Sequence, residues 1–94
     1  MIVRISEEAQ YELPEELHAR LDDLDDATVA AVDRGDEGAY YAAFEALLEF
    51  VRSEGTVIAD DDLRGSEIIL PPADLSFAEA GEDFTGEGLV PDPA

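Results

Sequence analysis

One stretch, residues 38–55, constrains the fold more than any other because it gathers large apolar residues at helical spacing. When successive positions are turned by about 100°, the largest of them fall on one side, namely Tyr40, Phe44, Leu47, Leu48 and Val51. Tyr41 and Phe50 lie on the two flanks of this surface. Together they cover roughly half of the helix circumference, whereas contact with one neighbour needs a stripe of about 100°. We therefore expect neighbours to pack against this helix from at least two directions.

Acidic residues dominate the charge of the chain. There are 25 Asp and Glu against 5 basic residues, all Arg, and the formal net charge is −20. Such a field repels itself in dilute buffer, but at molar salt the Debye length falls to about 3 Å and most of the repulsion disappears. Because the apolar periodicity and a hydrophobic content of 46% argue against an acidic disordered chain, we interpret the charge as halophilic adaptation. It also predicts no nucleic-acid partner and no direct docking on anionic lipid.

Length and composition restrict the class of protein further. A chain of 94 residues predicts a single domain, 1–94, with a small core. No apolar run reaches the roughly 18 residues expected of a membrane span, and the first residues lack the pattern of a secretory signal. The absence of cysteine excludes disulfides, thiolate metal sites and cysteine nucleophiles. We expect a cytoplasmic protein that reaches the inner membrane face only through a partner.

The first residues predict an N-terminal β-hairpin. Residues 2–5 form a β-branched run, residues 6–9 interrupt it, and residues 10–13 resume an alternating pattern. An edge strand at Ile2–Ile5 would present unpaired backbone groups to a second copy. A homo-oligomer formed through this strand is therefore one hypothesis.

An antiparallel two-helix hairpin, residues 14–54, is predicted next. Pro14 favours a first helical position, Gly35 a left-handed helix end and Asp36 an N-cap. The short connection forces the two helices to lie as antiparallel neighbours. The first helix has a narrow apolar stripe of Leu17, Leu21, Leu24, Thr28, Ala31 and Val32. Its outer face is predicted to carry Asp22, Asp23, Asp25 and Asp26.

The rest of the chain, from residue 56, is predicted to be less regular. Residues 56–59 are typical of a short strand, and residues 66–70 of an extended segment that Pro71-Pro72 prevents from continuing. A capping-box pattern at residues 76–79 predicts a short C-terminal helix, followed by a loop-like tail, 83–94. Expected anchors of the tail are Phe84, Leu89 and Val90. The whole is an α+β fold.

Candidate chemistry is sparse. His18 has acidic helix neighbours that would favour its protonated form, but we interpret it as a solvated helix residue. Asp60–Gly65 resembles the start of a calcium loop yet continues to Pro71 where a bidentate Glu is required. Asp22 and Asp26 share a helix face and could hold a hydrated cation. We expect no catalytic residue, no cofactor and no specific metal site.

The segment that fits least well into a core is Ile68–Pro72, where consecutive large apolar residues precede two prolines. Either it lies across the helical hairpin, or it is offered to a partner. The candidate partner-binding residues, from this segment and from the flank of the second helix, are Ile68, Ile69, Leu70, Pro71, Pro72, Leu75, Tyr41 and Leu48.

Several short motifs in this order resemble the PspA-associated protein family, PspAA, small proteins of archaea and actinobacteria. They are residues 1–5 with Gln10-Tyr11, residues 51–55 leading to Asp61-Asp62-Leu63, and residues 66–75 with Gly86–Pro91. The resemblance covers nearly the whole chain and is of the haloarchaeal type. Ala9 departs from it, since a glycine is expected before Gln10-Tyr11.

The resemblance implies a component of a phage-shock-type envelope stress response that acts with PspA, a coiled-coil protein of stressed membranes. It supplies no catalytic residue. We therefore expect a non-enzymatic adaptor that binds a PspA-like partner. Two alternatives belong to other classes: a self-associating structural module without contact to PspA, and a cation-responsive acidic protein.

Overall fold

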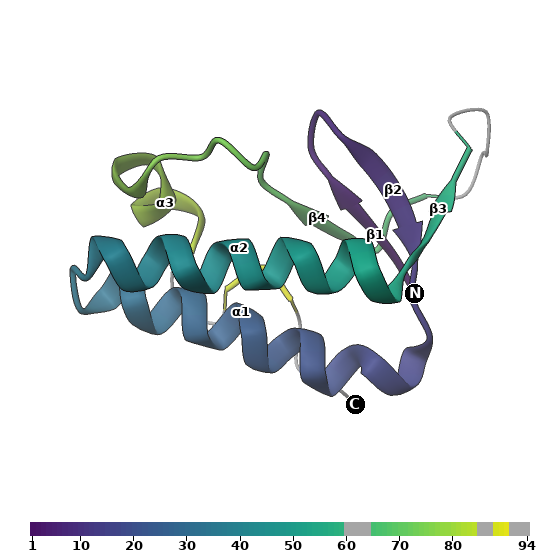
Figure 1. Cartoon of the computed structure of the whole chain (residues 1–94), viewed down its shortest axis with the longest axis horizontal. Helices are drawn as coiled ribbons and strands as arrows, with labels where there is room; N and C mark the ends of the chain where they lie inside the picture. The colour runs from purple at the N-terminus through teal and green to yellow at the C-terminus, as the bar shows by residue number, and fades with distance from the viewer. Residues whose placement is uncertain (60–64, 85–87, 91–94) are drawn as a thin grey trace.

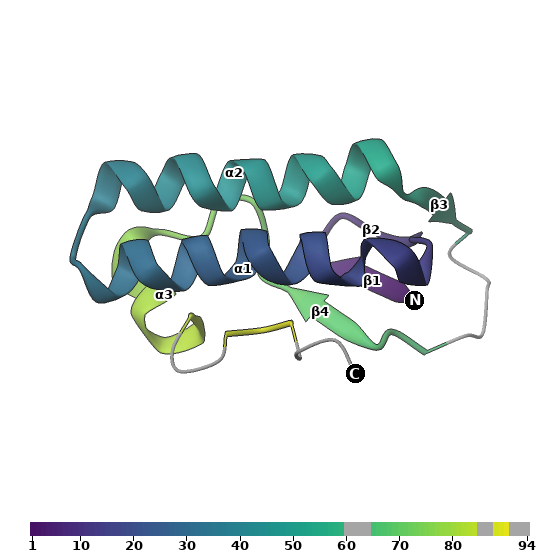
Figure 2. The same cartoon turned by 90° about the horizontal axis from the view of Figure 1, so that it is seen from below.

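The computed structural model describes residues 1–59, 65–84 and 88–90, which build two layers (Figure 1). One layer holds two long helices lying side by side, and the other holds a sheet and a short helix (Figures 1 and 2). The elements in chain order are β1 (Ile2–Ile5), β2 (Ala9–Glu12), the 3₁₀ turn η1 (Glu15–Leu17), α1 (His18–Asp33), α2 (Glu37–Glu54), β3 (Thr56–Ile58), β4 (Ile68–Leu70) and α3 (Phe77–Asp83). The predicted α+β class is confirmed.

The sheet contains four described strands in the order β3-β2-β1-β4. β1 pairs antiparallel with β2, as the predicted hairpin requires, and β2 pairs antiparallel with β3. β4 pairs with β1 in parallel, with Ile68 opposite Val3. The prediction that Ile2–Ile5 is an edge strand is therefore wrong, because β1 has a neighbour on each side. The extended segment before Pro71 supplies the second neighbour, and the edges are β3 and β4.

Local signals set the ends of the helices. The Asp36 Oδ1 atom accepts a hydrogen bond from the Ala39 backbone N–H at 3.1 Å, and Gly35 has φ +69°, so the predicted break between α1 and α2 is confirmed. Ser76 and Glu79 form the predicted capping box at the start of α3. Pro14 differs from its prediction: it precedes the 3₁₀ turn, and the α-helix begins only at His18.

The wide apolar face of α2 is covered from two directions, as its sequence predicts. α1 packs along one side, and α3 packs against the other side near the start of α2. There the Tyr40 ring stacks on Phe44 with centroids 5.6 Å apart, and Phe84 meets Phe44 edge-on at 5.6 Å. The Tyr40 hydroxyl donates to the Leu75 carbonyl at 3.0 Å. Burial raises the pKa of this hydroxyl to about 12.

The predicted outer face of α1 needs a correction. Asp23 and Asp26 are exposed, but Asp22 and Asp25 are buried, and Asp25 has no exposed surface. For Asp25 the reason is a second contact of α1, with the segment Gly88–Val90, which lies beside it (Figure 2). A helix that is touched on two sides cannot keep all of its acids in water.

The tail is anchored where the sequence predicts. Phe84 and Val90 are buried in the main core, and Leu89 is half-buried against it. The other tail residues, 85–87 and 91–94, lie outside the described residues, as does most of the calcium-loop-like segment at 60–64. Phe84 and Val90 thus anchor the described part of the tail in the core.

Candidate partner-binding groove

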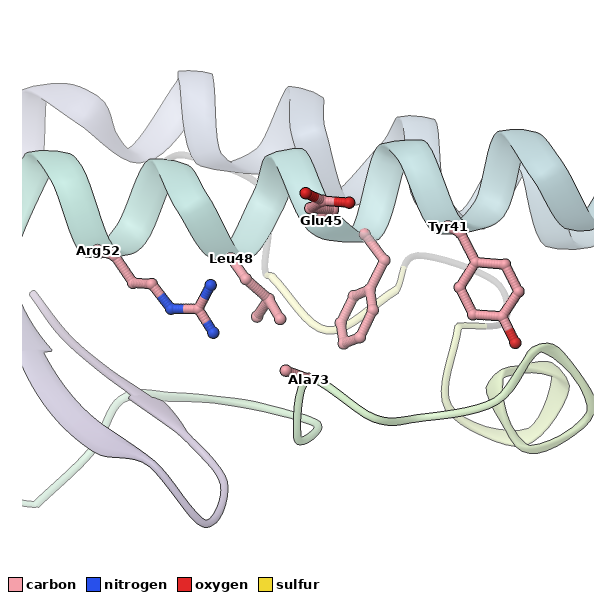
Figure 3. A pocket seen from close by; sticks show the side chains of 6 residues that line it. Tyr41, Glu45, Leu48, Arg52 and Ala73 are labelled. Carbon is pink, nitrogen blue, oxygen red and sulfur yellow. The ribbon is translucent and has the colours of Figure 1, made fainter.

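A groove runs along the exposed side of α2. Tyr41, Glu45, Leu48 and Arg52 recur at spacings of four, three and four residues, which places them in one row along the helix. The row borders a hollow of about 290 Å³ whose floor and walls are shown in Figure 3. The lining residues are Tyr41, Phe44, Glu45, Leu48, Arg52 and Ala73.

The opposite wall is the chain between β4 and α3. Its course is fixed by a turn in which the Leu75 N–H donates to the Pro72 carbonyl at 3.0 Å. Two tyrosines of α2 attach it to the helix: Tyr40 binds the Leu75 carbonyl, and the Tyr41 hydroxyl accepts from the Phe77 N–H at 3.1 Å. The Tyr41 ring is held in place in this way, yet 45% of the residue remains exposed.

Arg52 closes one end of the groove through an ion pair with the β1–β2 turn. Its Nη2 and Nε atoms donate to the two carboxylate oxygens of Glu8 at 2.6 and 2.8 Å. Its Nη1 atom lies 3.8 Å from Glu49. The hydrogen bond from Arg52 lowers the pKa of Glu8, and the same bond raises the pKa of Arg52. The positive charge of Arg52 is therefore already matched within the chain.

A second hollow, of about 340 Å³, adjoins the first at Ala73. It is lined by Ser6, Glu7, Glu8, Pro72, Ala73 and Asp74. Across the two hollows, carboxylates therefore outnumber the single guanidinium. Among the described residues no ion pair engages Glu7, Glu45 or Asp74. The rim of the groove is acidic, and its floor is apolar.

The structure brings some of the predicted partner-binding residues to this groove and not others. Tyr41 and Leu48 line it, and Pro72 lines the adjoining hollow. Ile69 is 57% exposed but alternates with the core-facing residues of β4, so it lies on the other face of the sheet. Buried within the fold are Ile68, Leu70, Pro71 and Leu75, together with most of Leu48.

Sequence reasoning missed four lining residues: Phe44, Glu45, Arg52 and Ala73. Phe44 was predicted only as a core residue. It is buried in the core and also forms the floor of the groove. The regular spacing of Glu45 and Arg52 with Tyr41 was a usable signal. No signal in the sequence points to Ala73, because its role depends on where the segment after β4 lies.

Asp22, Asp25 and Asp26 form an acidic cluster on α1, with carboxylate oxygens within 4.8 Å of one another. The Asp25 oxygens are engaged by the tail: the Leu89 N–H lies 3.2 and 3.1 Å from Oδ1 and Oδ2, and the Val90 N–H lies 3.0 Å from Oδ2. Burial raises the pKa of Asp25 despite these hydrogen bonds. Asp25 therefore has a structural task, which is to hold the tail.

The fold and the groove define a small α+β protein built on a helical hairpin. The chain belongs to the PspA-associated protein family, whose sequence profile it matches over residues 1–92. Comparisons with curated proteins and with solved structures gave no significant match. Within the described ranges, neither long helix carries a sufficiently long apolar stretch to cross a membrane. The family name ties the chain to the PspA system.

Proposed function

We propose that this protein is a non-enzymatic adaptor of a phage-shock-type envelope stress response, and that it binds a PspA-type coiled-coil protein through the groove beside α2. Family membership supports the choice of partner. The observation that carries the choice of surface is Tyr41, a large aromatic residue held in place at the lip of the groove and still half-exposed. Fixed, partly exposed aromatic residues are typical of the residues that dominate binding energy in protein interfaces.

Sedimentation of the purified protein with the PspA-type protein of the same organism, in molar KCl, tests this function. We expect a complex with a Kd of about tens of micromolar, which corresponds to a binding free energy of about −6 to −7 kcal/mol. Tyr41→Ala should weaken it about tenfold or more. Val57→Ala is the matched control, because Val57 is 64% exposed and lies on β3, away from the groove. Absence of any complex with the wild-type protein would contradict the proposal.

Self-association is a second candidate, favoured by one observation. Edge strand β3 carries the exposed Val57 side chain, and edge strand β4 carries the exposed Ile69 side chain. Exposed edges of this kind can pair with a second copy. Light scattering separates this candidate from the adaptor: a strict monomer at high concentration removes it, whereas a dimer broken by Val57→Lys supports it.

We also propose that the acidic surface adapts the chain to molar salt. The net charge of −20 is spread over a small body with few basic residues, so mutual repulsion should weaken the fold in dilute buffer. Circular dichroism should show helix lost at low salt and recovered near about 2 M KCl, where screening is nearly complete. Full helical structure in dilute buffer would contradict this proposal.

A further inference from the structure

We propose that the groove accepts an amphipathic helix whose apolar stripe is flanked on both sides by Lys or Arg. The inference rests on the proposed adaptor function for the identity of the partner. The chemistry of the contact is inferred from the groove itself: its length, its apolar floor and the charges on its two walls.

The length of the groove suits a helix. From Tyr41 to Arg52 the α2 wall extends about 17 Å at 1.5 Å per residue, which equals three turns of a partner helix. The hollow of about 290 Å³ is at the small end of ligand pockets, so it would take a few anchoring side chains and leave the partner backbone outside. Apolar anchors at positions i, i+4 and i+7 are the usual pattern for such docking.

The lip supplies most of the apolar contact surface, because 45% of Tyr41 is exposed. Phe44 and Leu48 form the floor, and both are fixed in the core with only 2% of their surface exposed. Tyr41 stands at the end of the row opposite Arg52, and its hydroxyl is bound to the start of α3 (Figure 3). Because these side chains are already ordered, they would lose little additional conformational freedom when a partner binds.

The acids of the groove favour basic residues on both sides of the partner helix's apolar stripe. Glu45 stands on the α2 wall, while Asp74 and Glu7 line the hollow across Ala73. No ion pair among the described residues neutralises these three acids, whereas Arg52 is already paired with Glu8. A helix with basic residues on both sides of its apolar stripe therefore meets opposite charges on both walls. A second copy of this acidic chain, or an anionic lipid surface, would meet like charges.

The test uses two designed helical peptides as probes, with the same leucine stripe flanked either by lysines or by glutamates. Fluorescence anisotropy measures their affinity for the full chain at the lowest KCl concentration at which circular dichroism shows it folded. We expect the lysine peptide to bind at least about tenfold more tightly, with NMR shifts centred on Tyr41, Glu45 and Ala73. Equal affinities, or shifts confined to other surfaces, would overturn the proposal.

A matched pair of variants separates the groove from general charge attraction. Glu45→Lys/Asp74→Lys reverses two acids of the groove, and Asp23→Lys/Glu82→Lys reverses two exposed acids elsewhere. Both change the net charge equally. We expect the groove variant to lose about tenfold in affinity for the lysine peptide and the control to lose less than about threefold. Equal losses would overturn the proposal, because they would show attraction without a site.

The PspA-type protein is the third probe, and it distinguishes failure of the inference from failure of the function. Unchanged binding of that protein to Glu45→Lys/Asp74→Lys keeps the adaptor function and overturns the groove as its site. No binding to the wild-type chain removes the adaptor function, and the peptide measurements then decide the groove chemistry separately.

Discussion

Two contacts between distant parts of the chain tie loops to the long helices, and they use opposite physical means. On α1 the carboxylate of Asp25 is fully buried and accepts backbone N–H groups from Leu89 and Val90. On α2 the guanidinium of Arg52 pairs with Glu8, and roughly a third of each side chain stays in solvent. The Asp25 carboxylate is shielded from water, so its hydrogen bonds are made only within the protein. The Arg52 and Glu8 side chains remain partly hydrated, so water competes for their hydrogen bonds.

This difference decides what each contact contributes. A buried donor that loses its acceptor keeps the full cost of desolvation, about 1–3 kcal/mol per group. An exposed ion pair that is broken regains water on both sides, and such pairs are typically worth about 0–1 kcal/mol. The better geometry belongs to Arg52 and Glu8, but the larger contribution to stability should come from Asp25.

Replacing Asp25 should therefore have the largest effect. We expect Asp25→Ala to lower the free energy of unfolding by about 3 kcal/mol, since it leaves the buried Val90 N–H and the partly buried Leu89 N–H without their acceptor. Chemical denaturation at constant KCl measures the change. Asp23→Ala on the same helix is the control, because Asp23 is exposed, and it should stay within about 0.5 kcal/mol of wild type. Similar losses in both variants would show that the tail contact is not what matters.

Gly88→Ala tests the contact between Asp25 and the tail by changing the tail residue beside the carboxylate. Gly88 has φ +79°, and a Cβ atom there would clash with the Asp25 carboxylate. Gly35 has φ +69° with nothing within 4 Å of such an atom. We expect Gly35→Ala to lower the free energy of unfolding by about 1 kcal/mol, from the backbone conformation alone. Gly88→Ala should lower it by about 2 kcal/mol or more, because steric conflict is added. Equal losses in thermal unfolding would mean that the tail can shift freely.

The pH dependence should have opposite signs at the two contacts. The pKa of Asp25 is raised, so the folded state binds its proton more tightly, and stability falls as pH rises from the ordinary pKa through the raised one. The pKa of Glu8 is lowered, so its contribution is present above the ordinary pKa and is lost as pH falls. Each proton changes stability by at most about 1.4 kcal/mol per pH unit.

Denaturant unfolding curves measured from pH 3 to 7 give the stability of each variant relative to wild type. We expect this difference to change with pH in opposite directions for Asp25→Asn and Glu8→Gln. The stability of Asp25→Asn relative to wild type should rise as pH increases through this range, and that of Glu8→Gln should fall. Parallel curves for all three proteins would contradict both assignments.

The smallest effect is expected for the exposed pair itself. A double-mutant cycle with Glu8→Ala and Arg52→Ala should give a coupling of about 0.5 kcal/mol, falling as KCl screens it. Arg34 and Asp36, 3.9 Å apart and more exposed, are the control pair and should couple less. A coupling above about 2 kcal/mol would remove the contrast between the two contacts.

The features predicted correctly from the sequence act over a few residues. Asp36 caps α2, Gly35 ends the preceding helix, and Ser76 with Glu79 starts α3, each through atoms within one helical turn. The width of the apolar face of α2 likewise follows from its own spacing. Local geometry is encoded locally, so reasoning from spacing and capping can recover it.

The features that escaped prediction depend on partners far along the chain. In the sequence Asp25 cannot be distinguished from the surface acids around it, because its partner Leu89 is 64 residues away. Glu8 and Arg52 are likewise 44 residues apart. Placing Ile2–Ile5 at an edge failed for the same reason, because β4 supplies its second neighbour. In the groove, Tyr41 and Leu48 were predicted from the apolar flank of α2, whereas Ala73 could not be, since the second wall is set by tertiary packing.

The parallel pairing of β1 with β4 also has a consequence for biosynthesis. Chains grow at about 5–20 residues per second, so β1 exists for seconds before Ile68–Leu70 is made. The helical hairpin forms much faster and covers one face of the sheet, but it does not occupy the open edge of β1. During that interval the first strand is exposed to pairing with other nascent chains. The last third of the chain therefore protects the first few residues, and chains that stop before residue 68 should aggregate through them.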